Sequence, residues 1–267
     1  LNEFPDELAL WDRAAELAVA SGRPTDLAEA YRAHILVSRE GDDGERHGPS
    51  EGVELELCDR AASLHDEQLG DSDGALPYLK RILAKDPHNA TAFARLKEIL
   101  SAAERWGELE SLFDQAAASA DDPRTKIELL SEVALVAEEV MGLPEKAIRY
   151  HERILEIDPL HEASLDALEK LYEDAERFGE LAALLERRLE TALDDEAVDI
   201  RLYLARLYLD QLLVPERALG HVEEILKSRS DDADARELGW KAMTSRPRCC
   251  ARRRRCCSRA CTRRATR

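Results

Sequence analysis

The chain has 267 residues, of which 35% are charged, 44% are hydrophobic and 5% are aromatic, enough for one large domain or an array of repeats. No stretch is long and uncharged enough for a membrane-spanning helix, because the most apolar window, 129–140, is interrupted by Glu132, Glu138 and Glu139. The first ten residues, LNEFPDELAL, are acidic and carry no basic head before an apolar stretch, so we expect no secretory signal.

The net charge of −18 hides two opposite regions. The last 22 residues contain ten Arg and no acidic residue, whereas residues 1–245 contain 28 basic and 56 acidic residues. This balance argues against DNA or an anionic membrane as the partner of the acidic body. Cys58 is the only cysteine of the body, so no disulfide framework holds it together. We therefore predict a cytoplasmic location, with the periplasm as the alternative.

The spacing of apolar residues along the body is helical, as in Leu165, Leu168, Leu171 and Tyr172, and no alternating β-branched run is found. Pro and Gly stand where helices are expected to start or stop. In chain order we predict thirteen helices, at 6–20, 24–38, 51–69, 73–84, 89–103, 106–119, 123–141, 144–156, 160–175, 178–192, 195–212, 215–228 and 231–244. They pair into six hairpins and one unpaired last helix, with a polar loop insert at 41–50 after the second helix.

The sequence repeats itself at a shift of 72 residues. The segment DPHNATAFARLKEILSAAERWGELESLF, which starts at Asp86, overlays DPLHEASLDALEKLYEDAERFGELAALL, which starts at Asp158. The preceding segment ALPYLKRILAKDP (75–87) matches AIRYHERILEIDP (147–159) at the same shift. A single hairpin buries too little apolar surface to offset its ordering entropy, so the hairpins must stack as an α-solenoid.

The repeated unit resembles the tetratricopeptide repeat, a helix-turn-helix unit of about 34 residues. The best-matching unit starts at Glu162 and places apolar or aromatic residues at the family's characteristic positions, namely Leu165, Leu168, Tyr172, Phe178, Leu181 and Leu185. Small residues stand where the family prefers them at Ala134, Ala147, Ala205 and Ala218, whereas Glu169 and Lys97 depart from this pattern. The resemblance covers about 1–243 and implies an all-α, right-handed superhelix of about six hairpins.

The resemblance also implies a non-enzymatic scaffold that holds a peptide or a partner helix on a concave face lined by the first helix of each hairpin. Asn occurs only at Asn2 and Asn89, which disfavours the clamp that some members use for a C-terminal carboxylate. By family position, the groove of the later hairpins would expose Asp166, Lys170, Glu173, Asp174, Leu202, Arg206 and Leu209. We therefore predict a basic, amphipathic partner. The alternatives are a solvated helix face, or a regulatory domain of a larger enzyme or signalling protein of which this chain is a fragment.

No enzymatic motif is found in the sequence. It contains no HExxH, no GxSxG and no Gly-rich phosphate loop, so we predict no catalytic residue, metal or cofactor. His161 and Asn89 precede helices and are expected to cap them. Trp106 and Phe178 occupy equivalent repeat positions and are expected to be core wedges, and Cys58 is expected to be a small core residue.

The last segment, RPRCCARRRRCCSRACTRRATR (246–267), admits three interpretations: a basic nucleic-acid-binding arm, a cysteine metal cluster, or translation in the wrong reading frame. The spacing of its cysteines disfavours a shared zinc ion. We favour the frame error, because GC-rich codons for CCARRRRCC also encode LLRAAAALL in the neighbouring frame, which fits a further helix. We expect 246–267 to be disordered and the helix at 231–244 to be loosely docked.

Overall fold

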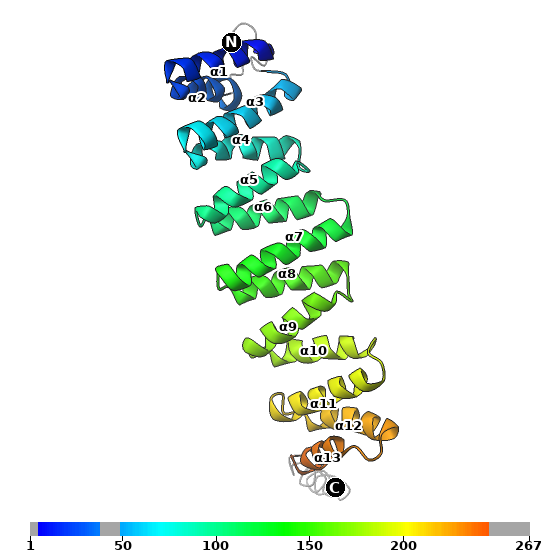
Figure 1. Ribbon diagram of the computed structural model, residues 1–267. Helices are drawn as coiled ribbons and strands as arrows, with labels where there is room; N and C mark the ends of the chain where they lie inside the picture. Colours follow the sequence, from blue (N-terminus) through cyan, green and yellow to red (C-terminus); the bar gives the residue numbers. More distant parts are fainter. Residues whose placement is uncertain (1–4, 38–48, 246–267) are drawn as a thin grey trace, which may run out of the picture. The chain divides into compact units, whose positions relative to one another are not determined.

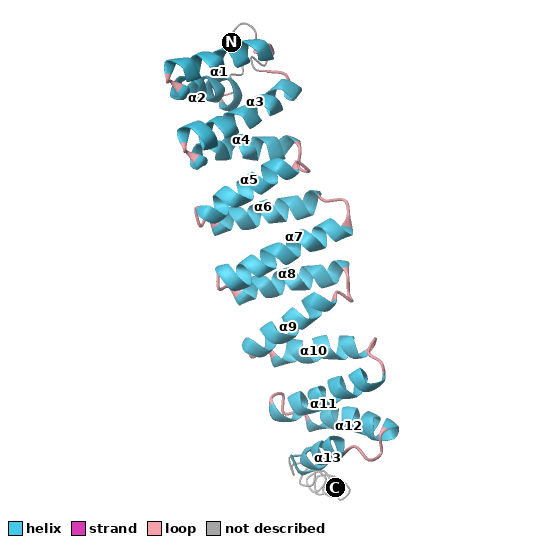
Figure 2. Ribbon diagram, viewed as in Figure 1, coloured by secondary structure: helices cyan, strands magenta, loops and turns pink. Residues whose placement is uncertain are grey.

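The structure is a computed structural model, and it describes residues 5–37 and 49–245. Every regular element within these ranges is a helix, as Figure 2 shows, so the prediction of an all-α repeat fold is confirmed. Most of the insert predicted at 41–50 and the whole segment 246–267 lie outside the described residues. The chain divides into two compact units, 1–143 and 144–267.

Unit 1 is a succession of helices in which each element packs against the next (Figure 1). Its elements are α1 (Leu8–Ser21), α2 (Pro24–Tyr31), the π-helical turn η1 (Arg32–Leu36), α3 (Glu51–Leu64), η2 (His65–Leu69), α4 (Ser72–Lys85), α5 (Ala90–Ala102), α6 (Trp106–Ser119), α7 (Pro123–Leu135) and η3 (Val136–Val140).

Unit 2 has the same plan, and its last helix, α13, packs against both α11 and α12. Its elements are α8 (Pro144–Ile157), α9 (Glu162–Asp174), α10 (Phe178–Leu189), α11 (Asp194–Asp210), α12 (Pro215–Ser228) and α13 (Ala233–Ser245). The predicted hairpin of 123–141 with 144–156 would join helices that belong to different units.

The helices begin where local chemistry satisfies their free amide groups. Asn89 Oδ1 accepts a hydrogen bond from the amide of Ala92 at 3.0 Å, and His161 Nδ1 accepts one from the amide of Ser164 at 3.3 Å. Both residues therefore cap the helices that begin after them, as predicted. Pro123 and Pro215 stand at the first position of α7 and α12, where a missing amide proton costs nothing.

Small residues at the helix crossings allow the backbones to approach closely. Ala134, Ala147, Ala205 and Ala218 are all fully buried, which confirms the small positions expected from the repeat pattern. Gly74 of α4 shows how tight the packing is, because a Cβ atom there would lie 2.1 Å from His65 Nδ1.

The outermost hairpin at the N-terminal end of unit 1 has an aromatic core. Trp11 and Tyr31 are buried with their rings stacked at 5.0 Å, and Trp11 Nε1 donates a hydrogen bond to the carbonyl of Pro5 at 3.0 Å. Two other aromatic residues are less deeply buried than predicted. Trp106 and Phe178 are half-buried rather than deep core wedges, because each is the first residue of its helix.

Two further expectations need correction. The helices predicted at 24–38, 51–69 and 123–141 do not continue as α-helices but end in π-helical turns, in which the Val37 amide reaches back to the carbonyl of Arg32 and the Met141 amide to that of Val136. The last helix is not loosely docked, since Ala235, Leu238 and Ala242 are buried against its neighbours.

Candidate partner-binding surfaces

The predicted groove residues come from two first helices of unit 2. Asp166, Lys170 and Glu173 are exposed along one face of α9, and Asp174 is exposed beside them. On α11, Arg206 is exposed and Leu202 is half-buried, whereas Leu209 is only 7% exposed. Leu209 was expected to be exposed to a partner, and this is wrong, because Leu209 belongs to the buried stripe of α11.

Several charges of this face are already paired within unit 2. Arg188 of α10 donates to Asp166 at 2.8 Å and to Glu169 at 3.3 Å. Burial raises the pKa of Glu169, and Arg188 offsets part of this effect. Arg206 lies 3.6 Å from Asp234 of α13. The unpaired negative charge that this face offers to a partner is therefore smaller than its residue types alone suggest.

Tyr203 connects the two first helices of this face. Its hydroxyl donates a hydrogen bond to Glu173, so α9 and α11 share a polar contact. Burial, together with the nearby carboxylates Glu173 and Glu169, raises the pKa of Tyr203 to about 12. The tyrosine remains a neutral donor at physiological pH, and it fixes the orientation of the Glu173 carboxylate.

The corresponding side of unit 1 contains a cavity of about 650 Å³ that the sequence did not reveal. First helices and the turn between η2 and α4 form its walls, which place four carboxylates beside one guanidinium group and a short apolar strip. Its lining residues are Asp66, Gly70, Asp71, Ser72, Asp73, Arg95, Glu98, Ile99, Ala102 and Ala103.

The charges around this acid-lined cavity are only partly matched. Arg95 donates to Asp66 Oδ2 at 2.7 Å and to Asp59 at 3.3 Å, and Arg105 donates to Asp73 at 3.0 Å. The other carboxylate oxygen of Asp66 is buried and accepts no hydrogen bond. Glu98 is exposed at the cavity, and its equivalent in the other copy of the repeat is Lys170, so the cavity has a stronger acidic character than the face on α9.

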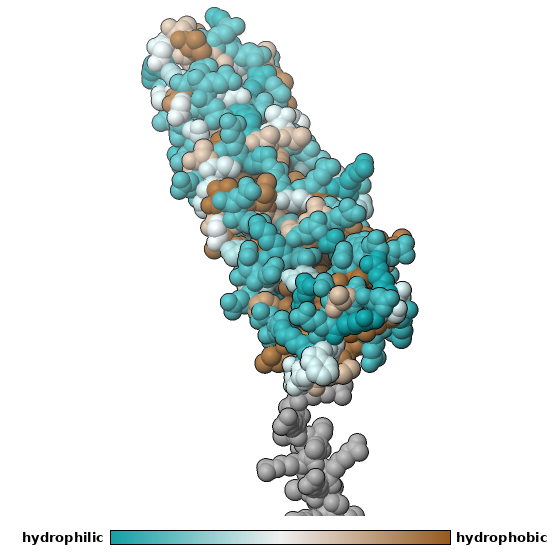
Figure 3. Space-filling view, turned by 60° about the horizontal axis from the view of Figure 1, so that its bottom comes forward, coloured by the Kyte–Doolittle hydropathy of each residue, from teal (hydrophilic) through white to brown (hydrophobic). Residues whose placement is uncertain are grey.

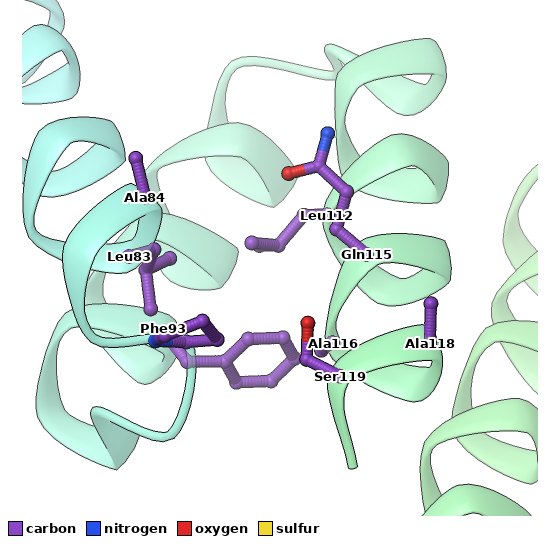
Figure 4. Close-up of a pocket in the computed structure, with 9 residues that line it drawn as sticks. Leu83, Ala84, Phe93, Leu112, Gln115, Ala116, Ala118 and Ser119 are labelled. Atoms are coloured by element: carbon purple, nitrogen blue, oxygen red, sulfur yellow. The ribbon is translucent and has the colours of Figure 1, made fainter.

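A second, largely apolar cavity of about 300 Å³ lies on the second-helix side of unit 1, between α4 and α6 (Figure 4). Figure 4 shows the Phe93 ring at its floor, with Leu83 on one wall and Leu112 and Gln115 on the other. Small side chains leave the space open. The complete lining is Leu83, Ala84, Pro87, Phe93, Leu112, Gln115, Ala116, Ala118 and Ser119.

The remaining candidates for chemistry have structural roles. Cys58 is fully buried, and this burial raises the pKa of its thiol to about 12, so it is a core residue as predicted. His151 Nδ1 and His161 Nδ1 both lie near the buried hydroxyl of Ser164, at 3.1 and 3.0 Å.

Within residues 5–37 and 49–245, no group of three His, Cys, Asp or Glu side chains is placed to hold a metal ion. No helix in the same ranges is long and apolar enough to cross a membrane.

A family model described as a tetratricopeptide repeat matches residues 164–198, which include most of α9 and the whole of α10. Residues 164–198 thus match one tetratricopeptide repeat. The family model thus matches the same unit that we identified from the sequence as the best match, the one beginning at Glu162.

Several solved structures have similar helical repeats at low sequence identity. YrrB, described as a TPR protein with an unusual peptide-binding site, is 17% identical over 68% of this chain and 89% of its own, with a TM-score of 0.33. PilF of Pseudomonas aeruginosa is 13% identical over 86% of this chain and 95% of its own, with a TM-score of 0.33. The TPR domain of P58(IPK) is 18% identical over 89% of this chain and 65% of its own, with a TM-score of 0.34. No curated protein matches the sequence.

Proposed function

We propose that the chain is a non-enzymatic scaffold that binds a basic, amphipathic segment of a partner protein on the surface of its first helices. The observation that carries this proposal is the acid-lined cavity on α5, where Asp66 retains an unpaired buried oxygen and Glu98 is exposed. A Lys or Arg side chain entering the cavity supplies a cation for the exposed Glu98 carboxylate and for the partly matched acidic charge of the walls. The apolar strip of Ile99, Ala102 and Ala103 accommodates an aliphatic neighbour of that cation.

The face of α9 and α11 is proposed as a second contact for the same class of partner. Asp166 and Glu173 supply negative charge, and Leu202 offers a half-buried apolar position. Because Arg188 already pairs with Asp166, we expect this face to contribute less binding energy than the cavity on α5.

The proposal is tested with the full chain and a fluorescein-labelled peptide of about 18 residues, composed of Lys and Leu at helical spacing. Fluorescence anisotropy measures its dissociation constant between low and physiological salt. We expect binding that weakens as salt rises, because surface charges are screened within about 8–10 Å at physiological ionic strength. An acidic peptide with the same apolar pattern serves as the control ligand and is expected not to bind.

Charge reversal then locates the site. Glu98→Lys places a cation in the cavity itself, and we expect a loss of about 5- to 10-fold in affinity, which corresponds to about 1–1.4 kcal/mol. The double variant Asp166→Lys/Glu173→Lys is expected to lose less. Glu216 and Glu223 are two exposed acids of the second helix α12, so Glu216→Lys is the matched control for Glu98→Lys, and Glu216→Lys/Glu223→Lys is the matched control for the double variant. Equal losses in Glu216→Lys and in Glu98→Lys would mean that only the net charge matters, and the proposed surface would be abandoned.

A further inference from the structure

The last described helix leaves one apolar face uncovered. Trp240 and Met243 of α13 are 73% and 63% exposed, and they lie three residues apart on the same side of the helix. In Figure 3, which turns the C-terminal end of the chain toward the viewer, pale and brown residues interrupt the mostly hydrophilic surface at this end of unit 2. Exposure of a Trp and a Met together is unusual for a helix whose opposite face is well packed.

The repeat provides a direct comparison for this face. The helices α9 and α13 both have 13 residues and begin 71 residues apart, at Glu162 and Ala233. At that shift Met243 is equivalent to Tyr172, yet Tyr172 is only 5% exposed. Tyr172 is bound on one side by α8, whose Glu152 accepts a hydrogen bond from its hydroxyl at 2.6 Å. On the other side the next helix contributes, because α10 packs against α9 and the guanidinium of Arg177, the residue before α10, lies 5.0 Å from the Tyr172 ring. The position of Met243 is thus one that a second helix covers in a complete hairpin.

The sequence after α13 does not match such a helix at the positions that α10 buries. The four buried residues of α10 are Leu181, Ala182, Leu184 and Leu185. At the same shift of 71 they correspond to Arg252, Arg253, Arg255 and Cys256. Three guanidinium groups in place of aliphatic side chains would have to be buried without partners, which is prohibitively costly.

The same codons give a different result when they are read one base earlier. Each new codon then consists of the last base of one codon and the first two bases of the next. Every cysteine codon begins with TG, so every cysteine becomes NTG, which encodes Leu, Met or Val whichever base precedes it. The result for the five cysteines of the tail therefore needs no assumption about codon usage: all become apolar.

The positions of these five residues fit one helix face. They stand at Cys249, Cys250, Cys256, Cys257 and Cys261. At 100° per residue they fall within an arc of about 140°, the width of the apolar stripe of a packed helix. Arg codons of the CGN type become NCG in this frame and encode Ala, Pro, Ser or Thr. The three positions that would bury guanidinium groups then carry small, uncharged residues.

We propose that the exposed face of α13 is the docking site for a second helix, encoded by the codons of 246–267 read one base earlier, and that the two helices form a seventh hairpin. The loss of positive charge in the shifted frame favours this helix as the occupant, because most of the ten Arg are replaced by small, uncharged residues that can pack against the apolar face of α13. One GC-rich reading of the 22 codons is AAALLRAAAALLLARLHAARDA, which combines strong helix formers with a Leu stripe.

The proposal is tested with three full-length proteins: the chain as written, the chain with its last 22 residues replaced by that sequence, and a control in which every Leu of the replacement is Gln. We measure thermal unfolding by circular dichroism, and the emission of Trp240 as the difference between each protein and its Trp240→Phe counterpart. The replacement is expected to raise the melting temperature by several degrees and to shift Trp240 emission to the blue, because a new interface adds stability to a repeat array. The Gln control is expected to do neither, and a chain ending at Ser245 should melt like the chain as written.

Three results would overturn the proposal. The first is a replacement helix that leaves both the melting temperature and Trp240 emission unchanged. The second is a chain as written that forms a dimer by light scattering with Trp240 already protected, which would make a second copy the occupant of the face. The third comes from the coding DNA itself, if the shifted frame meets a stop codon within the codons of 246–267.

Discussion

The carboxylate of Glu54 joins the two helices of the second hairpin, and its removal is expected to destabilise unit 1. Glu54 lies on α3 with a side chain that is 9% exposed, and it accepts hydrogen bonds from Arg81 and Lys85 of α4. The Arg81 and Lys85 side chains are 33% and 20% exposed. In Glu54→Ala the two cations remain near each other without the anion that holds them together.

The expected cost is set by this geometry. A hydrogen bond to a charged group contributes about 1.5–3 kcal/mol, and breaking a fully buried pair costs about 3–5 kcal/mol. Arg81 and Lys85 keep partial access to water, which recovers part of the loss. We therefore expect Glu54→Ala to lower the free energy of unfolding by about 2–3 kcal/mol at pH 7. Glu54→Gln retains one acceptor and is expected to cost about half as much.

The same network predicts a pH dependence. Burial raises the pKa of Glu54, but the hydrogen bonds from Lys85 and Arg81 lower it more, so the net pKa is below the ordinary value. A carboxyl with a depressed folded-state pKa stabilises the protein above its unfolded pKa of about 4.3, and this stabilisation is lost as the pH falls. The unfolding free energies of the chain and of Glu54→Ala should therefore converge as the pH falls below about 4.

Urea unfolding of the full chain, combined with hydrogen exchange in α3 and α4, measures this effect. Glu56→Ala is the matched control, because Glu56 lies on the same helix and pairs with Arg60 at the exposed surface. We expect it to cost less than about 1 kcal/mol. The reasoning is refuted if both variants cost the same at pH 7, or if the Glu54→Ala difference persists unchanged at pH 3.

Four smaller predictions concern single residues. In the native chain Cys58 should resist alkylation at pH 8, as read by peptide mass spectrometry, because burial raises its pKa to about 12; rapid labelling would contradict this. Gly74→Ala should lower the melting temperature, at a cost of about 1–3 kcal/mol, because its Cβ would clash with His65; an unchanged melting temperature would contradict this. Asn89→Ala should cost about 1 kcal/mol in urea unfolding through the lost cap, and no loss would mean that the cap is dispensable. Burial lowers the pKa of His221, so stability should fall as the pH drops below about 6.5 and fall less in His221→Phe; parallel pH profiles would contradict this.

The sequence was sufficient to place the helices, because each boundary has a local cause. Pro24, Pro123, Pro144 and Pro215 each begin a helix as predicted. The π-helical turns were missed, since their defining hydrogen bonds reach one residue further back and leave no periodic trace in the sequence. The only signal was a loop such as GLPEKA after η3, which is longer than the family's usual connection.

The candidate site was less predictable than the fold. Exposure of Asp166 and Glu173 is expected from helical spacing, but their pairing partners are not. Arg188 reaches Asp166 from a different helix, so the neutralisation of that carboxylate depends on tertiary packing. The acid-lined cavity is harder still, because Asp66 and Glu98 belong to successive hairpins and meet only after those hairpins stack. Sequence periodicity identifies which face of a single helix is exposed, whereas a cavity forms between helices whose relative positions the periodicity does not give.

The two copies of the repeat show where partner specificity can reside in this chain. Their buried positions are conserved in character at the 72-residue shift, as in Leu96 with Leu168, because the stacking of hairpins depends on them. Their outer positions diverge: Ala116 leaves a cavity of about 300 Å³ open in unit 1, whereas its equivalent, Arg188, pairs with carboxylates in unit 2. A substitution at an outer position changes what the surface can bind at little cost to stability. The exposed Glu98 carboxylate and the cavities of unit 1 thus make it the stronger candidate for recognition.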